Sequence, residues 1–222
     1  MRTAFAAAVM TAGLLTAPAA LAQDVVWNAG VFSDYRFRGF SQTDEGAALQ
    51  VGVDATAGGI YGGAWASNVD FGDDTEVEVD FYGGYRTVVG GFNVDVGGVV
   101  YLYMGSPAGT DYDYVEIKAA ASRAIGPVTV GAVAYWSPDF FGADEKATYV
   151  EANAAFAMAD GWTVSGAFGH QALDVNADYD TWNAGVSWAF SEKAVIDVRY
   201  HDTDVVGPLS DDRIVAGIKY LF

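Results

Sequence analysis

Hydrophobic and polar residues alternate with a period of two along most of the chain, which is the pattern of β-strands with two unlike faces. Over the final stretch the two faces are Ile214, Ala216, Ile218, Tyr220 and Phe222 against Arg213, Gly217 and Lys219. Such a strand suits lipid on one side and a polar lumen on the other. A strand closing a soluble sandwich would alternate in the same way, so this stretch alone leaves both structures open.

The same alternation predicts twelve strands, each long enough to cross a bilayer when tilted. The first is expected to run from Val25 to Phe40, with Tyr35 and Phe37 on its apolar face. The others are expected near residues 49–56, 61–68, 77–86, 92–102, 115–120, 128–136, 149–156, 162–169, 181–190, 196–201 and 213–222. Residues 61–68 show the weakest contrast between faces, because Tyr61 and Trp65 oppose Gly, Ala and Asn. The Ala-rich stretch 149–156 would also suit a helix, but its alternation favours a strand.

Short and long connections between these strands also alternate. The short ones contain good turn residues, as at 57–59, 90–91, 126–127, 160–161 and 191–193. The long ones are acidic and lie around 43–45, 72–74, 106–113, 137–146, 173–179 and 203–212. Short turns at one end and long loops at the other are typical of outer-membrane barrels. The predicted fold class is therefore all-β, a 12-stranded antiparallel transmembrane β-barrel.

The start of the chain predicts export. Arg2 is followed by an apolar run to Leu15 and by an Ala-x-Ala site ending at Ala22, which together indicate a cleaved signal peptide over residues 1–22. Residues 23–222 then form the barrel, and they contain no further uncharged apolar run of 18 residues that would suggest a membrane-spanning helix. A soluble barrel, with its apolar side chains inside, is the alternative fold. The export signal, the aromatic residues at strand ends and Phe222 favour the membrane.

Charge and composition narrow the partners. The chain has 29 acidic residues against 11 Lys and Arg, a formal net charge of -18, so nucleic acid is not an expected partner. Hydrophobic residues make up 52% of the sequence, which excludes a disordered acidic chain. The absence of Cys excludes disulfides and thiolate metal sites.

Charged residues on the polar strand faces are the candidate functional residues. We expect Arg36 and Arg38 to project into the lumen from the first strand, where Asp54, Glu78, Asp80 and Arg86 could pair with them. The complete expected pore lining is Asp34, Arg36, Arg38, Asp54, Glu78, Asp80, Arg86, Asp95, Glu116, Lys118, Glu151, Asp197, Arg199, Arg213 and Lys219. These charges would either line a pore or form a salt-bridge network that closes it. Twelve strands lie between a filled barrel and an open one, so strand number does not decide.

The sequence gives little support for a catalytic site or a metal site. Neither His170 nor His201 has a Ser in an arrangement that suggests a nucleophile and its base. The acidic run at 73–76 lacks the ligand spacing of a Ca²⁺ loop. No catalytic residue, metal or cofactor is expected.

Residues 33–43, SDYRFRGFSQT, together with Ala48-Leu49-Gln50 and Ala66-Ser67-Asn68-Val69-Asp70-Phe71, resemble the N-terminal signature of a proteobacterial family, the TorF-type porins. Phe40 stands where that signature suggests a smaller aliphatic residue. The strand that ends in Phe222, with Tyr220 two residues earlier and Gly217 upstream, resembles the C-terminal signal of bacterial outer-membrane barrels. These resemblances imply a channel that the outer-membrane assembly machinery inserts.

The expected function is passive diffusion of small hydrophilic solutes or ions through the outer membrane of a Gram-negative bacterium. A non-conducting barrel with a structural or surface-interaction role is the alternative, and a membrane-bound hydrolase is a more distant one. Membrane lipid, the assembly machinery and small solutes or ions are the expected partners.

Overall fold

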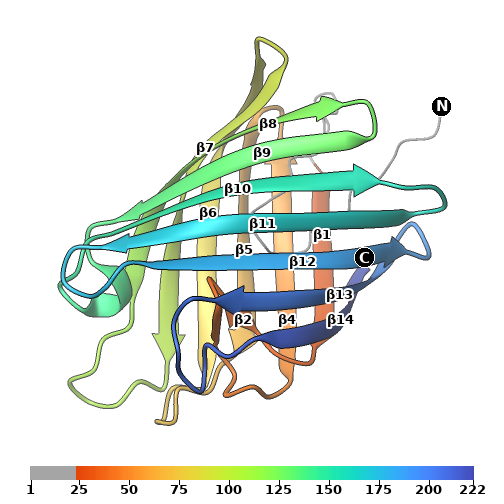
Figure 1. Ribbon diagram of the computed structural model, residues 1–222. Helices are drawn as coiled ribbons and strands as arrows, with labels where there is room; N and C mark the ends of the chain where they lie inside the picture. The colour runs from red at the N-terminus through yellow and green to blue at the C-terminus, as the bar shows by residue number, and fades with distance from the viewer. Residues whose placement is uncertain (1–23) are drawn as a thin grey trace.

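Twelve strands form one closed antiparallel barrel in the computed structural model, which describes residues 24–222 (Figure 1). The barrel strands are β1 (Asp24–Phe32), β4 (Ala48–Ala57), β5 (Ile60–Asn68), β6 (Val77–Val89), β7 (Phe92–Met104), β8 (Tyr114–Ile125), β9 (Val128–Ser137), β10 (Ala147–Ala157), β11 (Trp162–Leu173), β12 (Tyr179–Ala189), β13 (Ala194–Thr203) and β14 (Arg213–Leu221). Each strand pairs with its neighbours in sequence, and β14 pairs with β1 to close the wall. The predicted fold class is confirmed, and 149–156 is a strand.

The two ends of the barrel differ as predicted. Connections at the turn end, at the upper right of Figure 1, are residues 58–59, 90–91, 126–127, 158–161 and 190–193. Connections at the loop end are residues 33–47, 69–76, 105–113, 138–146, 174–178 and 204–212. The loop 138–146 includes the short 3-10 helix η1 (Phe140–Gly142). The signal-peptide prediction for residues 1–22 lies outside the described residues.

The wall is apolar outside and polar inside. Outward side chains such as Leu49, Ile117 and Ile218 are exposed, whereas the inward Asp95, Glu116 and Gln171 are almost completely buried. Alternation therefore does what a membrane barrel requires, because successive side chains of a strand point to opposite faces. Residues 61–68 also alternate, but here the large aromatic residues are inside: Tyr61 and Trp65 are buried in the lumen.

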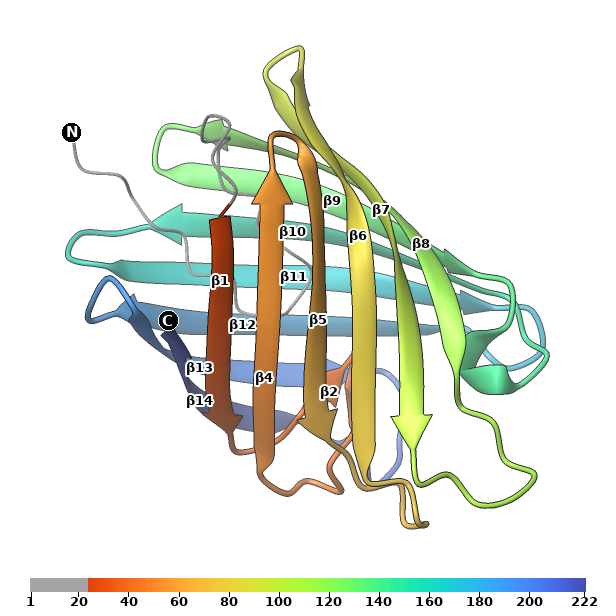
Figure 2. The ribbon, with the colours of Figure 1, turned by 180° about the vertical axis from the view of Figure 1, so that it is seen from behind.

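The prediction of a first strand from Val25 to Phe40 is wrong. Strand β1 ends at Phe32, and residues 33–47 leave the wall, turn into the lumen and form a small hairpin of β2 (Arg36–Phe37) and β3 (Phe40–Ser41), visible inside the barrel in Figure 2. Arg38 and Gly39 form its bend with positive φ angles of 46° and 93°. Alternation continues through Phe37, so the period-two pattern does not distinguish a wall strand from a hairpin inside the wall.

Candidate functional site: the barrel lumen

The inward hairpin is anchored most deeply by Arg38. Its guanidinium donates hydrogen bonds to Oε1 of Gln171 on β11 (3.0 Å) and to Oε2 of Glu116 on β8 (2.7 Å). The rings of Phe37 and Tyr149 lie 4.7 and 4.4 Å from its carbon Cζ, which adds cation–π attraction. Arg38 thus joins the hairpin to two wall strands, to β8 through a buried ion pair and to β11 through a hydrogen bond.

Charged and backbone groups fix the base of the hairpin. Arg36 donates hydrogen bonds to the carbonyls of Leu209 (3.0 Å) and Asp211 in the last loop. The carboxylate of Asp34 accepts hydrogen bonds from Ser41 (2.6 Å) and Thr43 (3.0 Å), both within the hairpin segment. Its other oxygen lies 3.6 Å from Nε of Arg213 on β14, so the segment is held by its own turns and by the wall.

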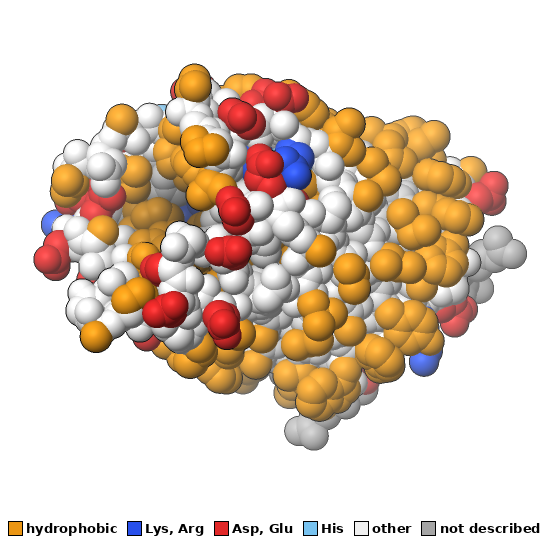
Figure 3. Space-filling view, turned by 90° about the horizontal axis from the view of Figure 1, so that it is seen from below, with side chains coloured by type: hydrophobic (Ala, Val, Ile, Leu, Met, Phe, Trp, Pro, Cys, Tyr) orange, Lys and Arg blue, Asp and Glu red, His pale blue; other side chains and the backbone are white. Residues whose placement is uncertain are grey.

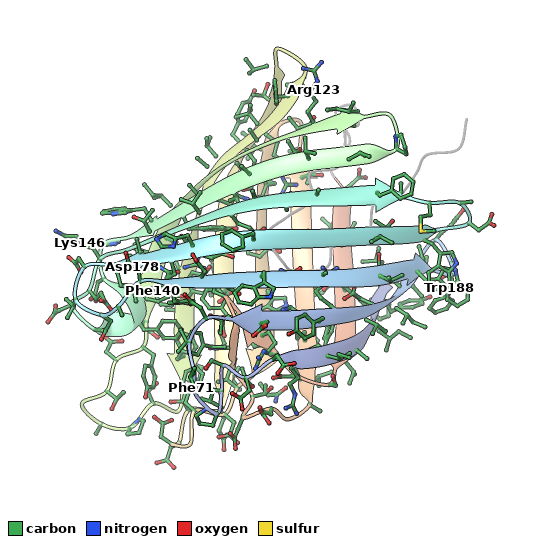
Figure 4. All side chains as sticks on the ribbon, viewed as in Figure 1. Phe71, Arg123, Phe140, Lys146, Asp178 and Trp188 are labelled. Atoms are coloured by element: carbon green, nitrogen blue, oxygen red, sulfur yellow. The ribbon has the colours of Figure 1, made fainter. Side chains whose placement is uncertain are left out.

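Aromatic residues pack against the side of the hairpin that faces β5 to β8. Tyr35 donates a hydrogen bond to Glu78 (3.1 Å) and its ring meets Trp65 edge to face at 5.3 Å. Phe37 contacts Tyr101 in the same geometry at 6.0 Å. These rings adjoin a buried cluster of Val69, Tyr101, Tyr103 and Tyr114, against which Phe71, Tyr112, Phe140 and Phe141 also pack. Figure 4 shows Phe71 and Phe140 at this end of the barrel.

The expectation that Tyr35 and Phe37 lie on the outward apolar face is therefore wrong. Both rings point into the lumen, because the segment that carries them has left the wall. The residues that resemble the TorF-type signature are the hairpin itself, Ser33 to Thr43, and part of its surroundings, including Val69 and Phe71. What looked like a first strand is a plug for the loop-end half of the lumen.

The turn-end half of the lumen is hollow. A cavity of about 300 Å³ lies on the turn-end side of the hairpin and is lined by both charged and aromatic side chains. The lining includes Arg36, Arg38, Asp54, Tyr61, Trp65, Asp80, Tyr82, Arg86, Tyr101, Lys118, Tyr135, Tyr149, Glu151, His201 and Lys219. A cavity of this size and polarity holds many waters or a small polar solute.

Glycines opposite tyrosines keep this cavity wide. A Cβ added to Gly63 would lie 2.5 Å from the ring of Tyr82, and one added to Gly97 would lie 2.7 Å from the Tyr61 hydroxyl. Both tyrosines therefore lie flat against the wall, where Tyr82 donates a hydrogen bond to Asp54 (2.6 Å). Larger residues at these glycines would push the rings into the lumen.

One carboxylate in the cavity wall carries three partners. Asp95 on β7 accepts hydrogen bonds from Tyr61 (2.7 Å), from Nζ of Lys118 (2.8 Å) and from Nε of Arg86 (3.2 Å). The guanidinium of Arg86 also lies 3.9 Å from the centre of the Tyr61 ring. Two cations against one anion leave this part of the wall with a net positive charge.

The structure places all fifteen expected pore-lining residues in the lumen, but not all on the wall. Asp34, Arg36 and Arg38 belong to the hairpin segment. The other twelve are on barrel strands with their side chains inward: Asp54, Glu78, Asp80, Arg86, Asp95, Glu116, Lys118, Glu151, Asp197, Arg199, Arg213 and Lys219. The expected partners of Arg38 are not the observed ones, since Glu116 rather than Asp54, Glu78 or Asp80 pairs with it. Asp197 pairs with Arg199 on the same strand (3.1 Å).

The lumen tyrosines and Gln171 are site residues that the sequence analysis did not select. They carry no charge, so charge on the polar faces could not reveal them. One available signal is the register between strands, which brings Gly63 of β5 beside Tyr82 of β6. Such a glycine–aromatic pair becomes recognisable only once two strands are aligned.

The C-terminal strand presents two environments. Tyr220 and Phe222 are outward and exposed, and their rings contact each other at 5.0 Å. Gly217 faces the lumen, where the ring of Phe32 from β1 covers it so closely that a Cβ would lie 2.0 Å from that ring. Gly217 thereby lets the first and last strands pack together at the closure. An assembly signal in these residues stays a prediction.

The loops at the loop end are acidic and are joined to one another by hydrogen bonds. Figure 3 shows acidic side chains spread over this end with little basic surface between them. Glu145 accepts hydrogen bonds from the backbone of Val175 (2.9 Å) and from the side chain of Asn176 (2.8 Å). Although burial opposes it, these bonds from the 174–178 loop lower the pKa of Glu145.

The two histidines and the metal-binding side chains are the remaining candidates for chemistry in the described part of the chain. His170 is half exposed on the outer wall, with Nδ1 2.7 Å from Asp180, and His201 is buried in the lumen. Among residues 24–222 there is no group of three or more metal-binding side chains, and no helix there is long and apolar enough to cross a membrane.

A family model described as "Bacterial protein of unknown function (Gcw_chp)" matches residues 16–217 of the sequence. The chain belongs to the Gcw_chp family. No curated protein matches its sequence. The match extends from the end of the predicted signal peptide through almost the whole barrel, so the family assignment covers the hairpin and the cavity together.

Solved porins share the fold of this Gcw_chp protein. The KdgM porin has a TM-score of 0.65 at 9% identity, covering 89% of this chain and 99% of the porin. The NanC porin has a TM-score of 0.57 at 9% identity, covering 89% and 98%. The COG4313 outer membrane channel from Pseudomonas putida F1 has a TM-score of 0.52 at 12% identity, covering 92% and 96%. At these identities the similarity establishes the porin-like barrel fold.

Proposed function

We propose that this Gcw_chp protein is an outer-membrane channel through which small hydrophilic solutes or ions diffuse passively, with no catalytic role. The cavity of about 300 Å³, lined by charges of both signs inside an apolar-faced barrel, is the observation that carries the proposal. Protein interiors are normally close-packed, so a polar cavity that glycines and flat tyrosines keep open supports the entry of a solute. The resemblance of residues 33–43 to TorF-type porins supports the same function.

The proposed location is the outer membrane of a Gram-negative bacterium, reached through cleavage of the signal peptide over residues 1–22. The turn end then faces the periplasm and the acidic loops face outward, as in other outer-membrane barrels. The outward apolar belt would contact lipid, and Gly217, Tyr220 and Phe222 would be read by the assembly machinery. One KdgM structure is a complex with disordered oligogalacturonate, which supports a small polar or charged solute here by analogy.

A non-conducting barrel with a structural or surface-interaction role is the second candidate. The observation that favours it is the hairpin, because Arg38 and Glu116 form a buried ion pair with side chains only 5% and 1% exposed. A plug fixed in this way could close the barrel permanently.

Single-channel recording of the refolded protein in a planar bilayer separates the two. Discrete conductance steps are expected from the channel. A demonstrably folded sample that produces no steps at any voltage would favour the non-conducting barrel.

A further inference from the structure

The hairpin has two unlike sides, and the difference follows from its sequence. Alternation places Tyr35 and Phe37 on one side of the extended segment and Asp34 and Arg36 on the other. We call these the aromatic face and the charged face. The aromatic face meets the cluster of Val69, Tyr101, Tyr103 and Tyr114, whose members are between 5% and 7% exposed. The rings on that side pack directly on one another, as in the Tyr101–Tyr114 stack at 4.2 Å, although the Tyr114 hydroxyl is buried there without a hydrogen-bond partner among the described residues.

The charged face borders a crevice instead. A space of about 40 Å³ separates it from the inner surfaces of β13, β14, β1 and β4, and its polar lining is Asp34, Arg36, Gln50, Asp197, Arg199 and His201. One water needs about 10–15 Å³ of such space, so the crevice has room for roughly three waters. Four of its lining residues, Tyr35, Arg36, Gln50 and His201, also line the large cavity, so the two spaces adjoin.

Unsatisfied polar atoms point to water in the crevice. Oδ2 of Asp34 and Nε of Arg36 are both buried without a hydrogen-bond partner among the described residues. Oδ2 does lie 3.6 Å from Nη1 of Arg36 and from Nε of Arg213, but that distance is too long for a hydrogen bond. A buried polar atom without a partner is costly, and an ordered water is the usual remedy. Both atoms belong to side chains that line the crevice.

We propose that water and small ions pass the hairpin along its charged face, through the crevice between the hairpin and strands β13, β14, β1 and β4. This route rests on the proposed channel and specifies its narrowest part. Two acidic and two basic residues line it, with Asp197 and Arg199 paired at 3.1 Å, so it carries almost no net charge. The crevice admits water and small ions, and a larger solute requires the hairpin to move.

Cysteine accessibility tests the route, because the chain has no native Cys. Val215→Cys places a thiol in the crevice, and Val69→Cys places one in the aromatic cluster; the two valines are similarly buried, at 7% and 5%. Val99→Cys, in the lining of the large cavity, shows that the reagent enters the lumen. The probe is Ag⁺ in nitrate salt, a thiol-reactive ion small enough for the crevice, with its binding to the thiol measured by mass and the conductance measured on the same refolded sample.

We expect Val215→Cys to react at a rate near that of Val99→Cys and to lose conductance on modification. Val69→Cys should react more slowly by about tenfold or more, since its thiol is reached only when the packing opens locally. An inert Val215→Cys beside a reactive Val99→Cys, or a Val69→Cys that reacts as fast as Val215→Cys, would overturn the route. Gln50→Cys, also in the crevice lining, replaces Val215→Cys if that variant does not fold.

The two readouts separate this proposal from the channel itself. Reaction at Val215→Cys in a folded barrel that passes no current contradicts the channel, and with it ion passage, while leaving the crevice hydrated. A conducting barrel in which Val69→Cys reacts faster contradicts the route and leaves the channel intact.

Discussion

The two halves of the lumen have the same wall and opposite contents. At the loop end, residues 33–47 fill the space, and buried contacts such as Arg38–Glu116 satisfy the charges. At the turn end, Gly63 and Gly97 let tyrosines lie flat, and a cavity of about 300 Å³ remains. Twelve strands set the circumference of both halves, so the local side chains decide whether a barrel of this width is filled or hollow.

Removing the main anchor of the filled half should have the largest effect. Arg38→Ala leaves Glu116 buried, with the Tyr101 hydroxyl (3.0 Å) as its remaining hydrogen-bond partner among residues 24–222, and breaking a buried pair in this way costs about 3–5 kcal/mol. We expect the hairpin to undock in a barrel that still folds. Conductance should rise, and residues 33–47 should become sensitive to protease.

The control is Arg123→Ala, since Arg123 lies at the turn end, where its guanidinium sits 5.3 Å from the Phe92 ring (Figure 4). This variant should keep the wild-type conductance. If Arg38→Ala also keeps it and stays protected from protease, the hairpin is held without this ion pair.

The cavity in the turn-end half should narrow when one of its glycines is replaced by a larger residue. Gly63→Ala would force the Tyr82 ring off the wall and away from Asp54, at an overpacking cost of about 1–3 kcal/mol. The conductance is expected to fall moderately. Gly62→Ala is the matched control on the adjacent outward position, where a Cβ meets only a backbone oxygen at 3.5 Å. Equal conductance in the two variants would show that the cavity does not limit the current.

The smallest expected effect is a modest cation preference of the channel, which the loop end should cause and the turn end should not. The loops carry Asp73, Asp74, Asp111, Asp113, Asp139, Asp144, Asp174, Asp178, Asp204, Asp211 and Asp212, with Lys146 as a rare base, so the outer mouth should concentrate cations. The preference should weaken with salt, because the screening length falls from about 30 Å at 0.01 M to about 3 Å at 1 M. Zero-current potentials at low and high mean salt measure it. An anion preference would place selectivity at Arg86 and Lys118 instead.

The sequence predicted the wall well and its contents poorly. Strands such as 92–102 and 213–222 were recognised because one buried and one exposed face imposes alternation at every step. The hairpin was missed because Tyr35 and Phe37 alternate with Asp34, Arg36 and Arg38 as a wall strand would. Tyr61 and Trp65 did not show which face of their strand is inward, since an aromatic residue suits either a cluster in the lumen or the lipid-facing surface of the barrel. Partners such as Glu116 for Arg38 depend on contacts across the lumen, which strand order alone does not define.

Replacing the hairpin tests most directly the claim that residues 33–47 close the loop-end half. Phe32 and Ala48 are directly paired across β1 and β4, so a two-residue Asn-Gly turn can join them in place of residues 33–47. The measurement is the single-channel conductance of this variant beside the wild type, with both confirmed as folded. The account predicts a conductance several-fold higher in the variant. An unchanged conductance in the folded variant would contradict it, because the hairpin would then not be the constriction.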